Sequence, residues 1–171
     1  MQMRPEYLLL PANRMFITFS IIAALLLNIL PWGRTGGIPD FVALVLVFWN
    51  IYQPRMVGMG IAFLVGLLMD VHAGALLGEH ALAYTLLSFG AISMHRRVLW
   101  FRPAGQMLYV LPLFLTAQLV TMMVRMMMGG NFPGWTYFLQ SFSCTLLWPL
   151  AEFLLLAPQR RSNEHDENRP L

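Results

Sequence analysis

The sequence predicts an all-α membrane protein with six transmembrane helices and both termini in the cytoplasm. Of its 171 residues, 58% are hydrophobic and 11% are charged, and the mean hydropathy is +0.62. This composition is typical of membrane proteins rather than of a soluble domain of the same length. Six segments are apolar over all or most of the roughly 20 residues that a helix needs to cross the hydrocarbon core. All eleven basic residues are arginines, and most of them fall in alternate connections.

The charge and the single cysteine exclude several classes of function. A net charge of +3, scattered along the chain, is too weak for a nucleic-acid groove, so we expect no nucleic-acid partner. Cys144 is the one cysteine, so no disulfide can form within the chain. It lies in an apolar run, where a cysteine behaves as a small buried hydrophobe.

The first predicted helix covers residues 15–32 and follows a charged, proline-containing lead (1–14) that we expect to be cytoplasmic. The helix could be mistaken for a signal peptide, but it ends in LLNILPWGRTGG, which lacks a small-residue cleavage pattern. We therefore expect an uncleaved spanning helix. The second helix starts in IPDFVALVLVFWNIYQ, where Pro39 suits a first helical turn and Asp40 suits the positive end of the helix dipole.

The third predicted helix is short. VGMGIAFLVGLLMDV has about 15 residues, and at 1.5 Å per residue these fall short of a hydrocarbon core about 30 Å thick. This helix must borrow flanking residues, thin the bilayer or be buried by its neighbours. The fourth helix covers 76–94 and stops at the basic run HRR (95–97).

The last two predicted helices complete the membrane domain. The fifth covers 104–128, carries Pro112 and ends at GGNFPGW, a glycine and proline turn. The sixth covers 135–157 and is interrupted by Pro149. The polar segment 159–171 is predicted to be a disordered cytoplasmic tail. The membrane domain therefore covers residues 15–158.

The arginine positions give the orientation. If the N-terminus is cytoplasmic, nine of the eleven arginines lie on the cytoplasmic side, and only Arg34 and Arg125 lie outside. Cytoplasmic connections of membrane proteins carry such an excess of positive charge, so both termini are predicted to be cytoplasmic. Four tryptophans lie near predicted helix ends, where indole rings favour the headgroup region: Trp32, Trp49, Trp100 and Trp135.

Five ionisable residues are predicted near the outward face of the membrane: Asp40, Asp70, Glu79, His80 and Arg125. In lipid such residues indicate a functional site by default. Imidazole and carboxylate are zinc ligands, yet Glu79 and His80 are adjacent and point in different directions on a helix, while His72 lies across two glycines. No catalytic or phosphate-binding motif accompanies them. We therefore expect no metal, no cofactor and no enzyme activity.

Three further polar residues lie within the predicted helices. Asn28 and Gln118 are the plainest polar groups in the middle of the membrane, and each is predicted to form an interhelical hydrogen bond rather than a substrate contact. Glu152 lies near the cytoplasmic end of the sixth helix. It either reaches the cytoplasmic surface or is a buried partner for an arginine such as Arg55 or Arg102.

Glycines gather in the third helix and after it. Gly58, Gly60 and Gly66 form a face of small residues, which lets helices pack closely in lipid. This face either packs tightly against another helix of the chain or forms an interface with a partner, and the sequence leaves both alternatives open. Gly74 and Gly78 permit a sharp turn and a close backbone approach before the fourth helix.

The chain resembles the MreD family of rod shape-determining membrane proteins. The resemblance rests, in chain order, on ALLLNILPW, IPDFVALVLVFW, PRMVGMGIAFLVGLLMDVHAGALLGEHALAY and LLWPL. The family pattern of G-x-x-x-D, a glycine-bearing turn and L-G falls on Gly66, Asp70, Gly74, Leu77 and Gly78. The resemblance covers most of residues 15–158, and its specific part is the third helix with the turn that follows.

The resemblance implies a noncatalytic scaffold in the bacterial inner membrane. Members of the family associate with MreC, a bitopic protein with one membrane helix, and so help to link cytoplasmic MreB filaments to the peptidoglycan synthases of cell elongation. The partners implied are therefore an MreC-like protein, indirectly MreB and the synthases, and membrane lipids.

The resemblance also leaves alternatives open. The family fold is similar to the six-helix substrate-binding components of ECF-type vitamin transporters, so a membrane-embedded small-molecule binding or transport component is the main alternative. An enzyme acting on lipid-linked wall precursors is a further alternative, although no reaction motif supports it.

Asp70 ends the third predicted helix, where the helix dipole disfavours a negative charge. We expect its carboxylate to accept backbone amides of the turn or of the start of the fourth helix. In that position Asp70, with His80 nearby, holds an outward pocket or docking edge in shape. The alternative is an exposed, solvated carboxylate at a helix end.

Overall fold

The computed structural model describes residues 13–31 and 37–159, which are all-helical and contain no strand. The α-helices are α1 (Arg14–Ile29), α2 (Phe41–Tyr52), α3 (Met59–Ala73), α4 (Glu79–Val98), α5 (Pro103–Met127) and α6 (Leu139–Leu156). The short 3-10 helices η1 (Trp135–Phe138) and η2 (Ala157–Gln159) lie at the two ends of α6. The predicted all-α class is confirmed. Nearly all of the predicted lead (1–14) and tail (159–171) lies outside the described residues.

The first two helices differ from the sequence prediction near prolines. α1 ends at Ile29 rather than at 32, because Leu30 is extended (φ −61°, ψ 138°) and a residue before proline disfavours helical geometry. Contrary to the prediction, Pro39 lies outside the first turn of α2 and precedes the N-cap of that helix. That N-cap is Asp40, whose carboxylate accepts the backbone N–H of Ala43 at 2.9 Å. The predicted place of Asp40 at the positive end of the helix is therefore confirmed.

Later helix ends also shift. α4 begins at Glu79 rather than at 76, because Gly78 precedes it with a φ of 108°. The helix then continues through the basic run 95–97, since positive charges are favourable at a helix C-terminus. The start of the sixth predicted helix is the 3-10 helix η1. α3 has 15 residues, so its predicted shortness is confirmed.

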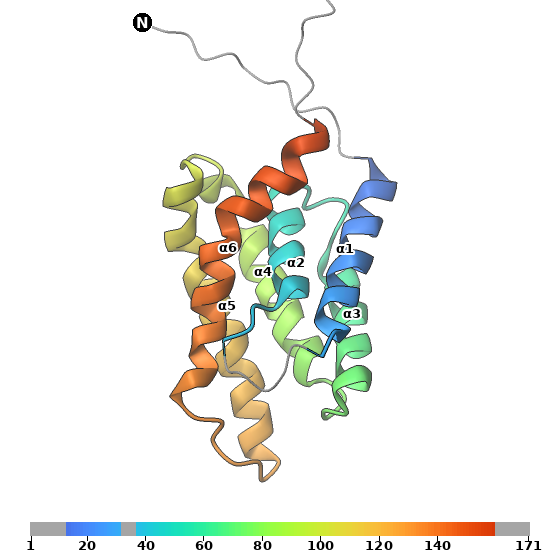
Figure 1. The fold of residues 1–171 in the computed structure, drawn as a ribbon, viewed down its shortest axis with the longest axis vertical. Helices are drawn as coiled ribbons and strands as arrows, with labels where there is room; N and C mark the ends of the chain where they lie inside the picture. Colours follow the sequence, from blue (N-terminus) through green and yellow to red (C-terminus); the bar gives the residue numbers. More distant parts are fainter. Residues whose placement is uncertain (1–12, 32–36, 160–171) are drawn as a thin grey trace, which may run out of the picture.

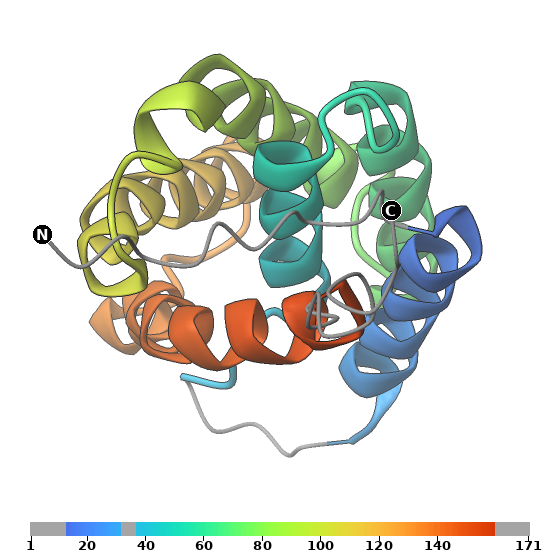
Figure 2. The same cartoon turned by 90° about the horizontal axis from the view of Figure 1, so that it is seen from above.

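α2 lies at the centre of the bundle, and the other α-helices surround it (Figure 2). α3 and α4 form the most extensively packed pair, α4 also packs on α2 and α5, and α5 packs on α6. α1 makes its main contacts with α2. α3 and α6 lie on either side of it (Figure 2).

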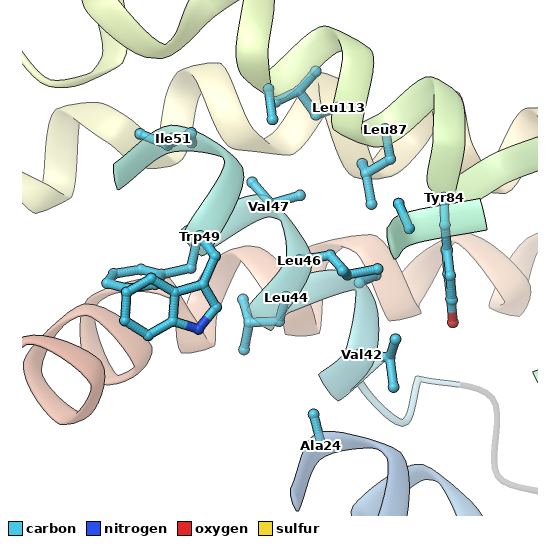
Figure 3. Packing of buried hydrophobic residues seen from close by; sticks show 14 of the residues in the cluster. Ala24, Val42, Leu44, Leu46, Val47, Trp49, Ile51, Tyr84, Leu87 and Leu113 are labelled. Atoms are coloured by element: carbon cyan, nitrogen blue, oxygen red, sulfur yellow. The ribbon is translucent and has the colours of Figure 1, made fainter. Parts of the chain in front are cut away.

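The hydrophobic core is built around α2 (Figure 3). Phe48 and Trp49 are fully buried and pack edge to face, with ring centroids 5.0 Å apart. Trp148 of α6 packs on Phe48 at 6.1 Å. Trp49 also donates a hydrogen bond from Nε1 to Ser20 Oγ of α1 at 2.8 Å, so this polar bond fastens α1 to the central helix.

The tryptophans divide into two groups. Trp49 is a core residue, so its predicted place in the headgroup region is wrong. Trp100 and Trp135 are 90% and 82% exposed and lie between helices, at opposite ends of the bundle. Trp32 lies outside the described residues.

Large apolar side chains are exposed on every α-helix except α2. Examples are Phe19, Leu64, Phe89, Leu108 and Leu146. By length and composition, two helical segments of the described chain are apolar enough to cross a membrane, Pro103–Met127 and Trp135–Gln159, while α1, α2 and α3 are shorter apolar helices. Of the six predicted crossings, this criterion supports two. The helices are compatible with a membrane protein, because a soluble monomer rarely exposes so much apolar surface.

The two ends of the bundle differ in what they contain (Figure 1). At one end, which we call the termini end, α1 begins and α6 finishes. The connections α2–α3 and α4–α5 lie at the same end. At the opposite end, the turn end, the tight turn 74–78 joins α3 to α4, and the connection 128–138 joins α5 to α6. The candidate site lies at the turn end.

Candidate functional site at the turn end

Polar side chains from α1, α3, α4, α5, α6 and η1, together with the N-cap residue of α2, gather at the turn end. We call this group the turn-end cluster: Asn28, Asp40, Asp70, Glu79, His80, Tyr84, Gln118, Thr121, Arg125, Tyr137, Gln140, Ser141 and Cys144. The five ionisable residues that the sequence predicted at the outward face are all in it. They come together because the short turn and the central position of α2 bring the same ends of these helices to one level.

The Asp70 carboxylate joins α3 to the start of α4. It is fully buried (0% exposed). Its Oδ2 accepts the backbone N–H groups of Gly78 (2.8 Å) and Ala81 (3.3 Å), and its Oδ1 accepts the backbone N–H of His80 (2.7 Å). His80 Nδ1 lies 2.9 Å from the same Oδ1. The expected hydrogen bonds to the start of the fourth helix are therefore present, and the alternative of a solvated carboxylate is wrong.

Local geometry explains why α4 needs this carboxylate. Its N-cap is Gly78, which has no side chain to accept the free amides of the first turn. Those amides carry the positive end of the helix dipole. Asp70 supplies an acceptor and a negative charge from the neighbouring helix. Gly74, the C-cap of α3, has the left-handed conformation (φ 58°). This conformation ends the helix and lets the chain turn back toward Asp70.

Gly66 lies one turn before Asp70 on the same face of α3. A Cβ on Gly66 would lie 2.4 Å from Ala81 Cα and 2.8 Å from the His80 carbonyl oxygen, so the backbones of α3 and α4 are in contact here. Gly58 and Gly60 differ, because no atom of the chain lies within 4 Å of a Cβ built on either. Gly66 is therefore part of a close helix contact inside the chain. An interface at Gly58 and Gly60 stays a prediction.

Asp40 links α2 to α1, α4 and α6. Asn28 of α1 donates from Nδ2 to Asp40 Oδ1 at 2.8 Å, and Tyr84 of α4 donates from its hydroxyl to Asp40 Oδ2 at 2.7 Å. The Asp40 backbone N–H donates to Cys144 Sγ of α6 at 3.1 Å. Asn28 therefore makes the predicted interhelical hydrogen bond, although it lies near the end of α1 and not in its middle. Cys144 is buried, as predicted.

Gln118 of α5 holds the start of α6. Its Nε2 donates to the Tyr137 carbonyl and to Gln140 Oε1, both at 3.0 Å, and its Oε1 accepts the hydroxyl of Ser141. Thr121, one turn on, lies 3.0 Å from the Tyr137 hydroxyl through its own Oγ1. The predicted interhelical role of Gln118 is confirmed.

The turn-end cluster encloses little free space. A cavity of about 50 Å³ lies between α2, α4, α5 and α6, with His80, Tyr84 and Gln118 in its lining. A cavity of that size has room for a few water molecules. A recess of about 190 Å³ opens beside it toward α1, lined in part by Asn28 and Asp40. Within the described residues, no three His, Cys, Asp or Glu side chains are arranged to hold a metal ion.

Several members of the turn-end cluster were not predicted from the sequence: Tyr84, Thr121, Tyr137, Gln140 and Ser141. Two of them leave a signal in the spacing. Tyr84 follows His80 by four residues and Arg125 follows Thr121 by four, so polar residues repeat on one face of α4 and of α5. Tyr137, Gln140 and Ser141 show no such pattern, because their partner Gln118 comes from another helix.

Glu152 and Pro149 lie away from the turn-end cluster, in the half of α6 nearer the termini end. Glu152 is 7% exposed and accepts the hydroxyl of Tyr52 at 3.0 Å. The side chain is therefore inside the bundle rather than at the cytoplasmic surface. Tyr52 is one partner of Glu152, and within residues 13–31 and 37–159 no ion pair joins Glu152 to Arg55 or Arg102.

The Glu79–Arg125 ion pair, which joins α4 to α5, gives a first prediction. Arg125 Nη2 donates to Glu79 Oε1 at 2.6 Å, and Glu79 is 2% exposed whereas Arg125 is 40% exposed. Arg125→Ala leaves a buried carboxylate without its cation, which is expected to cost about 1–3 kcal/mol. Thermal unfolding of the purified full chain in detergent measures this cost. Arg97→Ala, at an exposed position on α4, is the control and is expected to change little.

A second variant separates the ion pair from loss of packing. Adding Glu79→Gln to Arg125→Ala is expected to recover part of the lost stability, because the buried charge is then gone. If Arg125→Ala is as stable as Arg97→Ala, the ion pair does not stabilise the contact between α4 and α5.

A family model and a known protein that are similar to this chain carry the same description. The family model of rod shape-determining protein MreD matches residues 11–157. The rod shape-determining protein MreD of Haemophilus influenzae is 32% identical over 151 residues, which cover 85% of this chain and 90% of that protein. No solved structure matches. The residues matched by the family model include the whole turn-end cluster.

Proposed function

This chain belongs to the MreD family of rod shape-determining proteins, and on that premise we propose that it is a noncatalytic membrane scaffold of the cell-elongation complex. Membership of this family implies a role in rod shape determination. The further proposal is that the chain spans the bacterial inner membrane six times with both termini cytoplasmic, as a domain of residues 15–158. It binds an MreC-like bitopic protein and so helps to couple MreB filaments to peptidoglycan synthesis.

The arrangement of charge and apolar surface supports six crossings. Among the described arginines, Arg125 lies at the turn end, and the others lie at the termini end, which the proposed topology makes cytoplasmic: Arg14, Arg55, Arg96, Arg97 and Arg102. α2 has 12 residues and is too short to span the core alone, but it is enclosed by protein, where a short helix is tolerated. The surrounding helices expose apolar side chains, as lipid contact requires.

The noncatalytic part of the proposal is carried by one observation: each ionisable group of the turn-end cluster is hydrogen-bonded to another part of the bundle. Asp70 binds His80 and the start of α4, Glu79 binds Arg125, and Asp40 binds Asn28 and Tyr84. A catalytic acid or base needs access to a reacting group. These side chains instead hold the helices in fixed positions around a cavity of about 50 Å³.

A lateral groove supports the binding of a partner helix. The α1–α6 groove has a volume of about 430 Å³ and lies between α1 and α6, with α2 as its floor. Its lining contains no charged residue: Phe16, Phe19, Ser20, Ala23, Ala24, Leu27, Phe41, Leu44, Val45, Leu147, Leu150, Ala151, Leu154 and Leu155. It extends over residues 16–27 of α1, which is most of that helix.

The lining suits a helix because several of its side chains are small. Ser20 and Ala24 are four residues apart on α1, and Ala151 faces the groove from α6. Small residues at this spacing let a second helix approach closely, which is the main source of helix association in lipid. We assign this groove to the single membrane helix of the MreC-like partner.

A bulky residue in the α1–α6 groove tests this assignment. Ala23→Phe is expected to displace the partner helix and to make rod-shaped cells rounder, because the ring fills the groove. Thr116→Phe, which introduces the same phenyl ring on the exposed face of α5, is the control. A loss of about fivefold in copurified partner corresponds to about 1 kcal/mol of packing. Unchanged shape and partner recovery with Ala23→Phe would remove the groove from the interface.

The alternative function, small-molecule transport, would require a substrate pocket at the turn end. A fold like that of the ECF-type vitamin-binding components needs a substrate pocket, and such pockets usually measure about 300–1,000 Å³. The recess at the turn end measures about 190 Å³, so the scaffold function fits the available space better. Small molecules retained in stoichiometric amount through purification, with ligand-dependent stabilisation, would favour the alternative.

A further inference from the structure

A second lateral groove, between α1 and α3, carries positive charge at one end. This α1–α3 groove has a volume of about 630 Å³. Arg14, the first residue of α1, and Arg55, in the connection between α2 and α3, both line it. Both side chains are exposed, and neither forms an ion pair within residues 13–31 and 37–159. Two arginines that have no ion pair within the described ranges therefore line the termini end of one groove.

Beyond the arginines the walls of the groove are mostly aliphatic, with Thr18 and Met56 as the other side chains. Ile17, Ile21 and Leu25 repeat every four residues on α1, and Ile61, Leu64 and Leu68 line the wall formed by α3. From Arg14 to Leu25 an α-helix rises about 16 Å, which is close to half of a hydrocarbon core about 30 Å thick. The groove is thus about one leaflet deep, with charge at its mouth and an apolar interior.

We propose that the α1–α3 groove binds one anionic phospholipid of the cytoplasmic leaflet, with its phosphate held by Arg14 and Arg55 and an acyl chain along the aliphatic walls. Guanidinium groups match the geometry and charge of phosphate. The inference rests on the proposed topology, which puts the termini end at the cytoplasmic surface, and it is independent of partner binding.

Charge and length distinguish this occupant from others. A membrane helix of a partner would set its apolar side chains against two exposed arginines, and the groove would cover it for only half of the membrane. A free phosphate ion would use the arginines and leave the aliphatic walls unfilled. The α1–α6 groove has no arginine in its lining, so the two grooves beside α1 suit different occupants.

Native mass spectrometry of the full-length protein in detergent tests the proposal. The protein is titrated with dioleoyl phosphatidylglycerol or with dioleoyl phosphatidylcholine, which differ in headgroup charge. The groove variant is Arg14→Gln with Arg55→Gln. The control is Arg96→Gln with Arg97→Gln, which removes two charges from the same end outside the groove. Thermal unfolding checks that both variants are folded.

Wild type and control are expected to bind one phosphatidylglycerol about tenfold more tightly than phosphatidylcholine, and the groove variant is expected to lose this preference. If the groove variant fails to fold, Arg14→Gln and Arg55→Gln are tested singly, each with an expected loss of about threefold. Equal preference in the groove variant and the control would overturn the proposal, and so would equal binding of the two lipids by wild type.

Two further measurements separate the sources of the phosphate and the two proposals. Inorganic phosphate and the short-chain dihexanoyl phosphatidylglycerol are expected to compete weakly, because neither fills the aliphatic walls. Strong competition by inorganic phosphate would indicate a free-anion site instead of a lipid site. The groove variant is expected to retain the bitopic partner, so a failed lipid experiment and a failed scaffold proposal give different results.

Discussion

Asp70→Ala is expected to lower the free energy of unfolding by about 3–5 kcal/mol and to make rod-shaped cells round. The substitution removes the acceptor of three backbone amides at the start of α4 and the partner of His80. Gly78 has no side chain to cap α4, and Glu79, the acidic residue of the first turn, is bound to Arg125 and makes no cap hydrogen bond. Thermal unfolding in detergent measures stability, and microscopy of cells that carry only the variant measures shape.

Asp70→Asn is the matched variant for Asp70. It keeps one side-chain oxygen as an acceptor but loses the charge, so an intermediate loss of stability is expected. Wild-type stability, partner recovery and cell shape with Asp70→Ala would contradict the account, because the turn would then form without the carboxylate.

Gly66→Ala is expected to destabilise the pair α3–α4 by about 2–3 kcal/mol through overpacking. The added methyl carbon would lie 2.4 Å from Ala81 Cα, and a backbone cannot move aside as a flexible side chain can. The two helices must separate, which also draws Asp70 away from the amides of α4. Thermal unfolding and the amount of protein in the membrane report the effect.

Gly60→Ala, in the same helix, is the control for Gly66→Ala. No atom of the chain lies within 4 Å of a Cβ at Gly60, and alanine favours a helix over glycine by up to about 1 kcal/mol. The two substitutions are therefore expected to have opposite signs. Equal losses would mean that helix propensity and membrane insertion, rather than contact with α4, decide the effect.

The all-α class and most helix positions could be predicted from the sequence, because runs of apolar residues of suitable length are a strong local signal. The structural reason for the G-x-x-x-D spacing follows from local helix geometry. Gly66 and Asp70 share one face of α3, and the turn glycines Gly74 and Gly78 both have positive φ. Local rules therefore explain how α3 is joined to α4.

The rest of the candidate site depends on contacts between distant segments, which sequence spacing does not report. Asp40 reaches Tyr84, 44 residues away, and Gln118 reaches Ser141, 23 residues away. Trp49 was misplaced for the same reason. Its position near a helix end predicts the membrane surface, whereas the central place of α2 makes it part of the core.

Affinity purification of the full-length protein from its native membrane, followed by mass spectrometry, tests the scaffold function most directly. We expect stoichiometric recovery of an MreC-like protein with a single membrane helix. Recovery of a pair of energising ATPases, or of a small molecule in stoichiometric amount without a bitopic protein, would contradict it. The turn-end recess would then be a substrate site.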